Sequence, residues 1–252
     1  MKKLFLTAAI AFSGVFAMAQ SNGATVTKVE TRTVSGAELK RMIGNVKITD
    51  PKVYDREGNV VDSAEVVRRL ATYEYQKGWT QVNGEYRHLI TKIDTVRQAA
   101  VDRNTKLMLK PASAKLQEGV TLDLRPFKSH VDVKALQGKA IVLVFWCDGC
   151  YGGSQADAYK PVNEVLSRFY NPDKLAIITV THHAIEHSFA ALKKNPIINT
   201  QHIVAAPQLA REFETNGRPV LVLADTNHKI LYAVKDNAMM TPRILYFALK
   251  DL

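Results

Sequence analysis

The chain has 252 residues and a formal net charge of +10, from 34 Lys and Arg against 24 Asp and Glu. Hydrophobic residues make up 46% of the sequence, which is the apolar content of a folded chain with room for one or two domains. The basic residues are dispersed, with no Lys/Arg block and no interleaved aromatic residues, and this pattern argues against nucleic-acid binding.

The first residues have the pattern of an export signal. A basic Met-Lys-Lys start precedes an apolar run over residues 4–17, and Ala17-Met18-Ala19 fits the small-x-small rule for cleavage before Gln20. The run is too short to span a bilayer, and no later segment reaches the roughly 18 apolar residues that a transmembrane helix needs. We therefore expect a signal peptide at residues 1–19 and a periplasmic or otherwise exported mature chain without a transmembrane segment.

Residues 20–112 are predicted to form a small α+β module of unknown role. The pattern favours a short strand at Val53-Tyr54 and a helix over Ser63–Gln76. A hairpin is predicted between residues 79 and 90, because Asn83-Gly84 favours a two-residue turn. Nothing in this part of the sequence points to a particular chemistry.

A domain boundary is predicted at residues 110–115, and strands then alternate with helices over residues 116–252. In chain order the pattern first predicts a strand over 140–146 and a helix that opens at a Ser154–Asp157 capping box and is kinked at Pro161. A strand over 175–180 and a helix with Ile185, Phe189 and Leu192 on one face follow. The last predicted elements are a helix over 206–213, a hairpin of strands 220–224 and 229–234, and a helix from Thr241-Pro242. This alternation predicts the α/β class, with a mixed central sheet flanked by helices.

The chain has only two cysteines, Cys147 and Cys150, and they follow the predicted strand directly in the segment Trp146-Cys147-Asp148-Gly149-Cys150. A C-x-x-C pair at a strand-to-helix turn is a redox arrangement, because the positive end of a helix dipole lowers the pKa of a nearby thiol. A structural disulfide and a metal site are the competing interpretations. Asp148 inside the motif would oppose thiolate formation.

Residues 116–252 resemble the thioredoxin superfamily, and in particular its exported TlpA/ResA-like branch. The similarity rests on the run from Gly138 to Trp146, on the two cysteines, and on the segment Gly217-Arg218-Pro219-Val220 before a predicted hairpin. The resemblance implies a thioredoxin-like fold and an exported thiol-disulfide oxidoreductase without a cofactor. Its partners would be protein thiols and disulfides and an upstream redox protein.

The register of the active-site motif stays open. Aligning on Trp146-Cys147 keeps the family's W-C-x-x-C and makes Cys147 the attacking thiol. Aligning on Phe145-Trp146 makes Cys150 the attacking thiol, puts Gly153 where a resolving cysteine is expected, and leaves Cys147 to resolve from the N-terminal side. Both alignments give a dithiol/disulfide pair.

The resemblance also assigns the residues around the cysteines. It implies that Pro219 is a cis-proline facing the cysteine pair, with the backbone of Arg218 turned towards an extended substrate strand. Trp146 belongs to the substrate-binding surface, although packing explains it equally well. Val144 stands where many thioredoxins bury a carboxylate, so no general base is predicted.

Two other functions remain as alternatives. His182 and His183 follow the second buried strand, and His183 and His187 have the i, i+4 spacing of a helix face, so Cys147 and Cys150 with His182 or His183 could form a copper or other metal-delivery site. The chain could also be a non-catalytic interaction domain on a thioredoxin scaffold, because fold alone does not fix function.

Overall fold

The computed structural model describes residues 48, 50–148, 159–215, 218–235 and 242–252. The predicted signal segment, Cys150 and the Ser154–Asp157 capping box lie outside these residues. Contacts divide the chain into two compact units: the described residues up to Val67 with Lys77–Thr91, and Arg68–Gln76 with Lys92–Leu252. None of the helices in the described residues is long and apolar enough to cross a bilayer.

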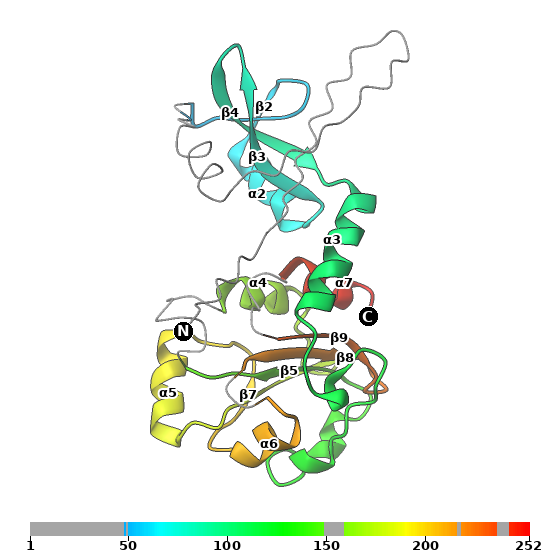
Figure 1. The fold of residues 1–252 in the computed structure, drawn as a ribbon. Helices are drawn as coiled ribbons and strands as arrows, with labels where there is room; N and C mark the ends of the chain where they lie inside the picture. The colour runs from blue at the N-terminus through cyan, green and yellow to red at the C-terminus, as the bar shows by residue number, and fades with distance from the viewer. Residues whose placement is uncertain (1–47, 49, 149–158, 216–217, 236–241) are drawn as a thin grey trace, which may run out of the picture. The chain divides into compact units, whose positions relative to one another are not determined.

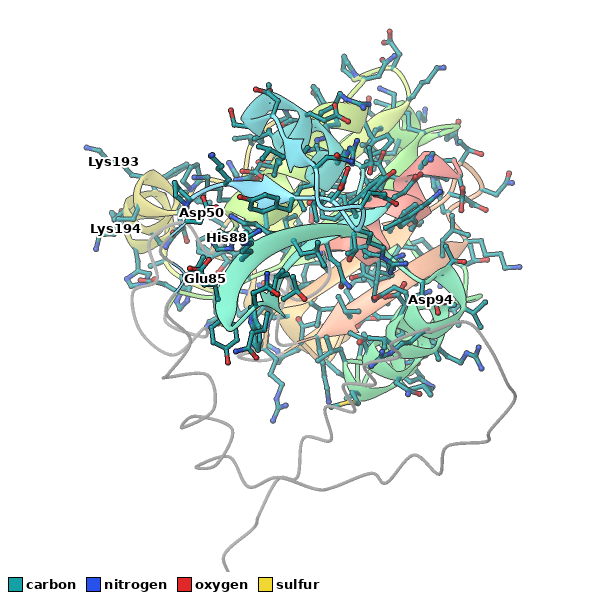
Figure 2. The ribbon with its side chains drawn as sticks, turned by 90° about the horizontal axis from the view of Figure 1, so that it is seen from above. Asp50, Glu85, His88, Asp94, Lys193 and Lys194 are labelled. Carbon is teal, nitrogen blue, oxygen red and sulfur yellow. The ribbon has the colours of Figure 1, made fainter. Side chains whose placement is uncertain are left out.

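The first unit is built around a four-stranded sheet of order β2-β1-β4-β3 (Figure 1). Its strands are β1 (Val53–Tyr54), β2 (Val60–Val61), β3 (Tyr75–Val82) and β4 (Glu85–Lys92). The predicted hairpin is confirmed: Asn83 and Gly84 join β3 to β4 with φ of 51° and 85°, the left-handed pair that a type I′ turn requires. Glu85 and His88 of β4 are labelled in Figure 2.

Helix α2 (Ser63–Ala71) begins where predicted but ends five residues early. The Thr72 hydroxyl donates to the Arg69 carbonyl at 2.7 Å, and Tyr73 adopts φ of 55°, so the chain leaves the helix before Tyr75. The predicted continuation to Gln76 is therefore wrong, because Tyr75 and Gln76 already belong to β3.

The second unit has the predicted α/β architecture, a mixed five-stranded sheet of order β7-β6-β5-β8-β9 with helices on both faces (Figure 1). Strands β5, β6 and β7 run parallel, and β8 and β9 are antiparallel additions beyond β5. The strands are β5 (Ala140–Phe145), β6 (Leu175–Val180), β7 (Gln201–Ile203), β8 (Val220–Ala224) and β9 (Ile230–Lys235). The helices are α3 (Thr95–Met108), α4 (Lys160–Phe169), α5 (Ile185–Lys194), α6 (Pro207–Glu212) and α7 (Pro242–Lys250), with three short 3-10 helices η1 (Ala114–Leu116), η2 (Arg125–Phe127) and η3 (Val133–Leu136).

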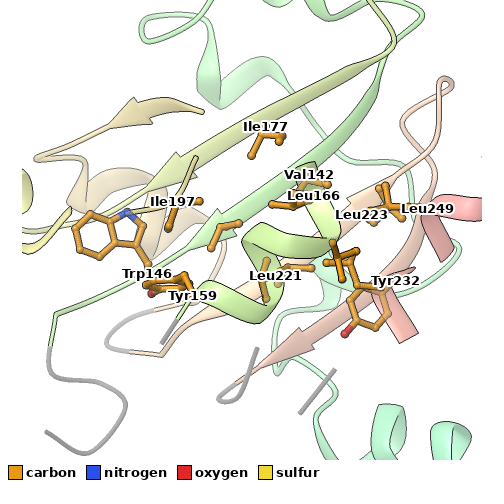
Figure 3. Close-up of a cluster of buried hydrophobic side chains, with 14 of the residues drawn as sticks. Val142, Trp146, Tyr159, Leu166, Ile177, Ile197, Leu221, Leu223, Tyr232 and Leu249 are labelled. Carbon is orange, nitrogen blue, oxygen red and sulfur yellow. The ribbon is translucent and has the colours of Figure 1, made fainter. Parts of the chain in front are cut away.

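Alternation along β5 supplies a separate core to each face of the sheet. Val142 and Val144 belong to the cluster formed with α4, α5 and α7, shown in Figure 3, whereas Ile141 and Leu143 belong to the cluster formed with η1, η2, η3 and α6. All six residues of β5 are buried, as expected for a central strand covered on both faces.

Two predictions about the helices on the first face are wrong. Pro161 lies in the first turn of α4, where its missing N–H and fixed φ favour helix initiation, so it starts the described helix instead of kinking it. On α5, Leu192 is buried with Ser188 and Ala191, whereas Ile185 and Phe189 are exposed. The apolar spacing of Ile185, Phe189 and Leu192 therefore does not mark the face that packs on the sheet.

The two edge strands of this sheet, β7 and β9, each leave little backbone free to pair with a further strand. Strand β7 has three residues. Along β9, the preceding segment of the chain makes main-chain hydrogen bonds: Gly119 N–H donates to the Ile230 carbonyl at 2.7 Å, and Ile230 N–H donates to the Val120 carbonyl at 2.8 Å. Next to these bonds, Thr121 and Lys229 form one isolated antiparallel bridge.

Candidate functional site

The register of the sheet brings three of the predicted site segments to one edge. Phe145, the last residue of β5, is paired with Val180 at the end of β6 and with Val220 at the start of β8. The residues after β5, the residues after β6 and the residues before β8 therefore meet at the carboxyl end of the parallel strands, which is where open α/β sheets place their sites.

Cys147 is 4% exposed and follows Trp146, whose N–H donates to the Val180 carbonyl at 3.0 Å. That hydrogen bond extends the pairing of β5 with β6 by one residue, so the main chain leaves the sheet at Cys147. Cys150 lies outside the described residues, and the geometry of the C-x-x-C pair is not part of the described structure.

Trp146 is buried as well, and its indole lies close to Tyr159 in the hydrophobic cluster formed with α4, α5 and α7 (Figure 3). Among the described residues, its Nε1–H has no hydrogen-bond acceptor. Burial agrees with a packing role for this side chain, in contrast to the exposed substrate-binding surface that the resemblance implied.

Asp148 is held by two histidines from the region of α5. Its main-chain N–H donates to Nε2 of His183 at 2.9 Å. Its carboxylate Oδ2 lies 3.0 Å from Nε2 of His187, one turn further along the chain. The residue directly after Cys147 is therefore bound through both its main chain and its side chain.

The His183 backbone is itself fixed by its neighbours. Its N–H donates to Thr181 Oγ1 at 3.4 Å, and its carbonyl accepts from the Ala205 N–H at 2.9 Å and from Ser188 Oγ at 3.1 Å. Thr181 and Ser188 are buried, and Ala205 adopts φ of 51°, a conformation that costs an L-residue about 1–2 kcal/mol. The loop after β6 is therefore held in place by hydrogen bonds to buried residues.

The three imidazoles lie close together. The centroid of the His183 ring is 4.3 Å from that of His182 and 4.7 Å from that of His187. Burial holds the pKa of His183 below its ordinary value, and the two neighbouring rings lower this pKa further. The Asp148 carboxylate opposes them with a smaller effect. A depressed pKa keeps Nε2 available as an acceptor near neutral pH.

The predicted metal ligands are brought together only in part. Within the described ranges, no group of three or more His, Cys, Asp or Glu side chains is placed to hold a metal ion. Cys147 and His183 approach the same edge, but Nε2 of His183 already accepts the Asp148 N–H. The fourth predicted ligand, Cys150, is outside the described residues.

Arg218 and Pro219 precede β8 at this edge, Arg218 exposed and Pro219 buried. The Arg218 N–H donates to the Thr215 carbonyl at 3.0 Å. The prediction of a cis peptide bond is wrong, since none of the described peptide bonds is cis. The trans form of an X–Pro bond is the more stable by about 0.5–1 kcal/mol, so the sequence alone does not fix the isomer.

Two supports of the site, Ser188 and Ala205, were not expected from the sequence. Ser188 has the ordinary pattern of a helical serine, and Ala205 carries no glycine or asparagine signal for its left-handed backbone. Thr181, directly after a buried strand, was the one available sign that the loop is packed inward.

Comparisons with known proteins give similarity of fold. No family model matches the chain, and no curated protein matches it. Among solved structures it is similar to a secreted disulfide oxidoreductase of Mycobacterium tuberculosis (21% identity, 48% of this chain and 88% of that chain, TM-score 0.37). It is also similar to a thioredoxin-like protein of Parabacteroides distasonis (18%, 53% and 96%, 0.36) and to PrxQ of Xylella fastidiosa (12%, 54% and 96%, 0.42).

Proposed function

We propose that the chain is an exported thiol-disulfide oxidoreductase that exchanges disulfides with protein partners through Cys147 and Cys150. The observation that carries the proposal is the position of Cys147. It lies two residues after the end of the central strand β5, at the edge where β5, β6 and β8 meet, and the only other cysteine comes three residues later. A dithiol at the carboxyl end of a central parallel strand is suited to redox exchange.

Burial of Cys147 favours one order of attack. A cysteine residue that is only 4% exposed is poorly placed to attack a disulfide on a large protein partner, so Cys150 is the attacking thiol and Cys147 the resolving one. The Cys150 thiolate forms a bond to one sulfur of the partner disulfide, and the other partner sulfur leaves as a thiolate. The Cys147 thiolate then attacks Cys150, which closes the Cys147–Cys150 disulfide and releases the second partner thiol, so two electrons pass to the partner.

The proposed setting is the periplasm, reached after cleavage of residues 1–19. There an upstream redox protein would supply electrons to return the pair to the dithiol form, since no bound cofactor is needed for exchange between thiols and disulfides. Arg218, which is exposed, and Pro219, which is buried, lie before β8 at the same edge and are the residues proposed to contact a partner segment.

The test is reduction of a disulfide-containing protein probe by the wild type and by Cys147→Ser, Cys150→Ser and the double variant. We expect each single variant to lose turnover. Mixed disulfide with the probe should accumulate in Cys147→Ser, which keeps the attacking thiol and lacks the resolving one. Trapping in Cys150→Ser alone would reverse the order of attack, and full turnover in both single variants would overturn the proposal.

The histidine cluster favours one second candidate, a metal-delivery module. The His183 ring lies within 5 Å of the His182 ring and of the His187 ring, and the exposed His182 offers a nitrogen ligand. Titration of the reduced chain with Cu(I) distinguishes the two functions. Stoichiometric binding that His182→Ala abolishes, together with no disulfide exchange, would favour the metal module.

A further inference from the structure

Asp148 makes two contacts with histidines: its main-chain N–H donates to His183, and its carboxylate contacts His187. The Asp148–His187 contact is solvent-exposed, with side chains 44% and 52% exposed, and exposed contacts of this kind contribute little. The bond to His183 instead fixes a main-chain donor one residue after the buried Cys147. It can restrict the direction of the chain between the two cysteines.

His183 is in turn fixed from three directions. Its N–H donates to the buried Thr181, and its carbonyl accepts from Ala205, which has a left-handed backbone conformation. The hydroxyl of the buried Ser188 is shared between this carbonyl, at 3.1 Å, and that of Ala184, at 2.8 Å. Residues are held in sparsely populated conformations where the surrounding structure over-determines them, and such positions cluster at functional sites. The imidazole therefore accepts the Asp148 N–H from a residue whose backbone is held by its own hydrogen bonds.

We propose that His183 is a positioning residue for the Cys147/Cys150 pair, acting through the Asp148 N–H. This inference rests on the proposed function and assigns the anchor that holds the chain where it leaves Cys147. Only Asp148 and Gly149 separate the two cysteines in the sequence, so the Asp148 peptide is one of the few units that set the course of the chain after Cys147. The hydrogen bond to His183 is made while Cys147 is disulfide-bonded, so it stabilises the disulfide form and favours closure.

The anchor needs an acceptor at the position of Nε2, not an imidazole as such. The side-chain carbonyl of Gln at position 183 extends about as far and accepts a hydrogen bond, whereas Ala provides neither feature. His183→Gln and His183→Ala therefore separate the acceptor from the ring. His187→Ala removes the exposed contact with the Asp148 carboxylate and the ring beside His183, but leaves the acceptor of the Asp148 N–H in place. His130→Ala, at an exposed histidine after η2, is the matched control.

The experiment measures the equilibrium constant of the cysteine pair with glutathione in the full-length mature chain, alongside the thermal midpoint of each variant. We expect His183→Ala to lower the constant for disulfide closure about tenfold, which is about 30 mV for a two-electron couple. His183→Gln should restore most of the change, His187→Ala should give a smaller shift, and His130→Ala should match the wild type.

The outcomes separate the two claims. If the wild type exchanges disulfides and His183→Ala has the same constant, the positioning role is wrong and the oxidoreductase stands. Equal shifts in His183→Ala and His183→Gln would also overturn the role, because the acceptor would then be irrelevant. If the wild type exchanges with no partner and never equilibrates with glutathione, the proposed function fails and the positioning role fails with it.

Discussion

At the scale of single residues, the histidines of the second unit differ in what surrounds them. His202 on β7 is half-buried, and its Nδ1 lies 2.8 Å from the hydroxyl of Thr179, which is itself buried on β6. Burial lowers the pKa of His202 below its ordinary value of 6.5, as it does for His183. The folded state therefore favours the neutral form of both rings.

This pKa shift sets the direction of a pH dependence. Above the ordinary pKa of 6.5 both states carry a neutral ring and His202 contributes nothing to the pH dependence. As the pH falls below that value the unfolded chain binds the proton first, so the free energy of unfolding decreases until the pH passes below the lowered pKa. We expect the urea midpoint to fall between about pH 7.5 and about pH 5, and His202→Asn, which can keep a bond to Thr179, to fall less. An equal decrease in both proteins would contradict the assignment.

The sequence could predict that cysteines and histidines approach each other, but not how. Cys147 and His183 both follow buried strands, and the carboxyl ends of neighbouring parallel strands lie at one edge. The bond that joins them runs through the Asp148 N–H, and a main-chain donor leaves no mark in a sequence. The isomer of Pro219 was not fixed either, because both forms lie within about 1 kcal/mol.

At the scale of elements, α5 shows how apolar spacing can mislead. Three apolar residues at i, i+4 and i+7 suggested one buried face, yet Leu192 is 8% exposed and Phe189 is 56% exposed. The buried face of the helix is formed by the small residues Ser188 and Ala191 together with Leu192. Lys193 and Lys194 in its last turn are exposed, where positive charges favour the helix dipole (Figure 2).

The two apolar residues of α5 give a paired prediction for stability. Leu192→Ala removes a buried side chain from the first core cluster and should lower the free energy of unfolding by about 2–3 kcal/mol. Phe189→Ala removes an exposed ring and should change it by less than about 0.5 kcal/mol. Chemical denaturation of both variants measures the difference. A larger loss for Phe189→Ala would show that the sequence pattern, and not the structure, identifies the packed face.

Elements with a strong local sequence pattern were predicted correctly, whereas elements with a weak pattern were not predicted. The bounds of β6 and β8 are as predicted, because each is a continuous apolar run between turn signals. Helix α3 could not be assigned, since its apolar residues form no stripe and none of its residues is buried. Its available signal was the cap, where Asp94 accepts from the Val96 and Arg97 N–H groups. Strand β7 is too short to show any period.

At the scale of the whole molecule, the two units differ in how much apolar core they hold. In the described part of the first unit the buried hydrophobic residues are Val66 and Ile90, whereas the second unit has a cluster on each face of its sheet. The second unit also gathers residues from before its sheet: Arg243 donates to the Tyr73 carbonyl at 3.2 Å and pairs with Asp102.

This difference predicts unequal stability within one chain. Because local opening is easiest where little apolar surface is buried, main-chain amides of β3 and β4 should exchange with solvent faster than those of β5 and β8. Hydrogen exchange followed by mass spectrometry under native conditions measures this directly. Equal protection of the two sheets would mean that the first unit draws stability from residues beyond those described.

The small amount of unpaired backbone at the edges of the larger sheet affects how readily the chain aggregates at high concentration. An exposed strand edge is a template on which a second molecule can add its own strand, and this is a common route to aggregation. Here β7 offers three residues, and the segment over residues 119–120 already binds part of β9. A neighbouring copy would find little free backbone to pair with along these strands, so this sheet should resist growth into larger assemblies even when the chain is crowded.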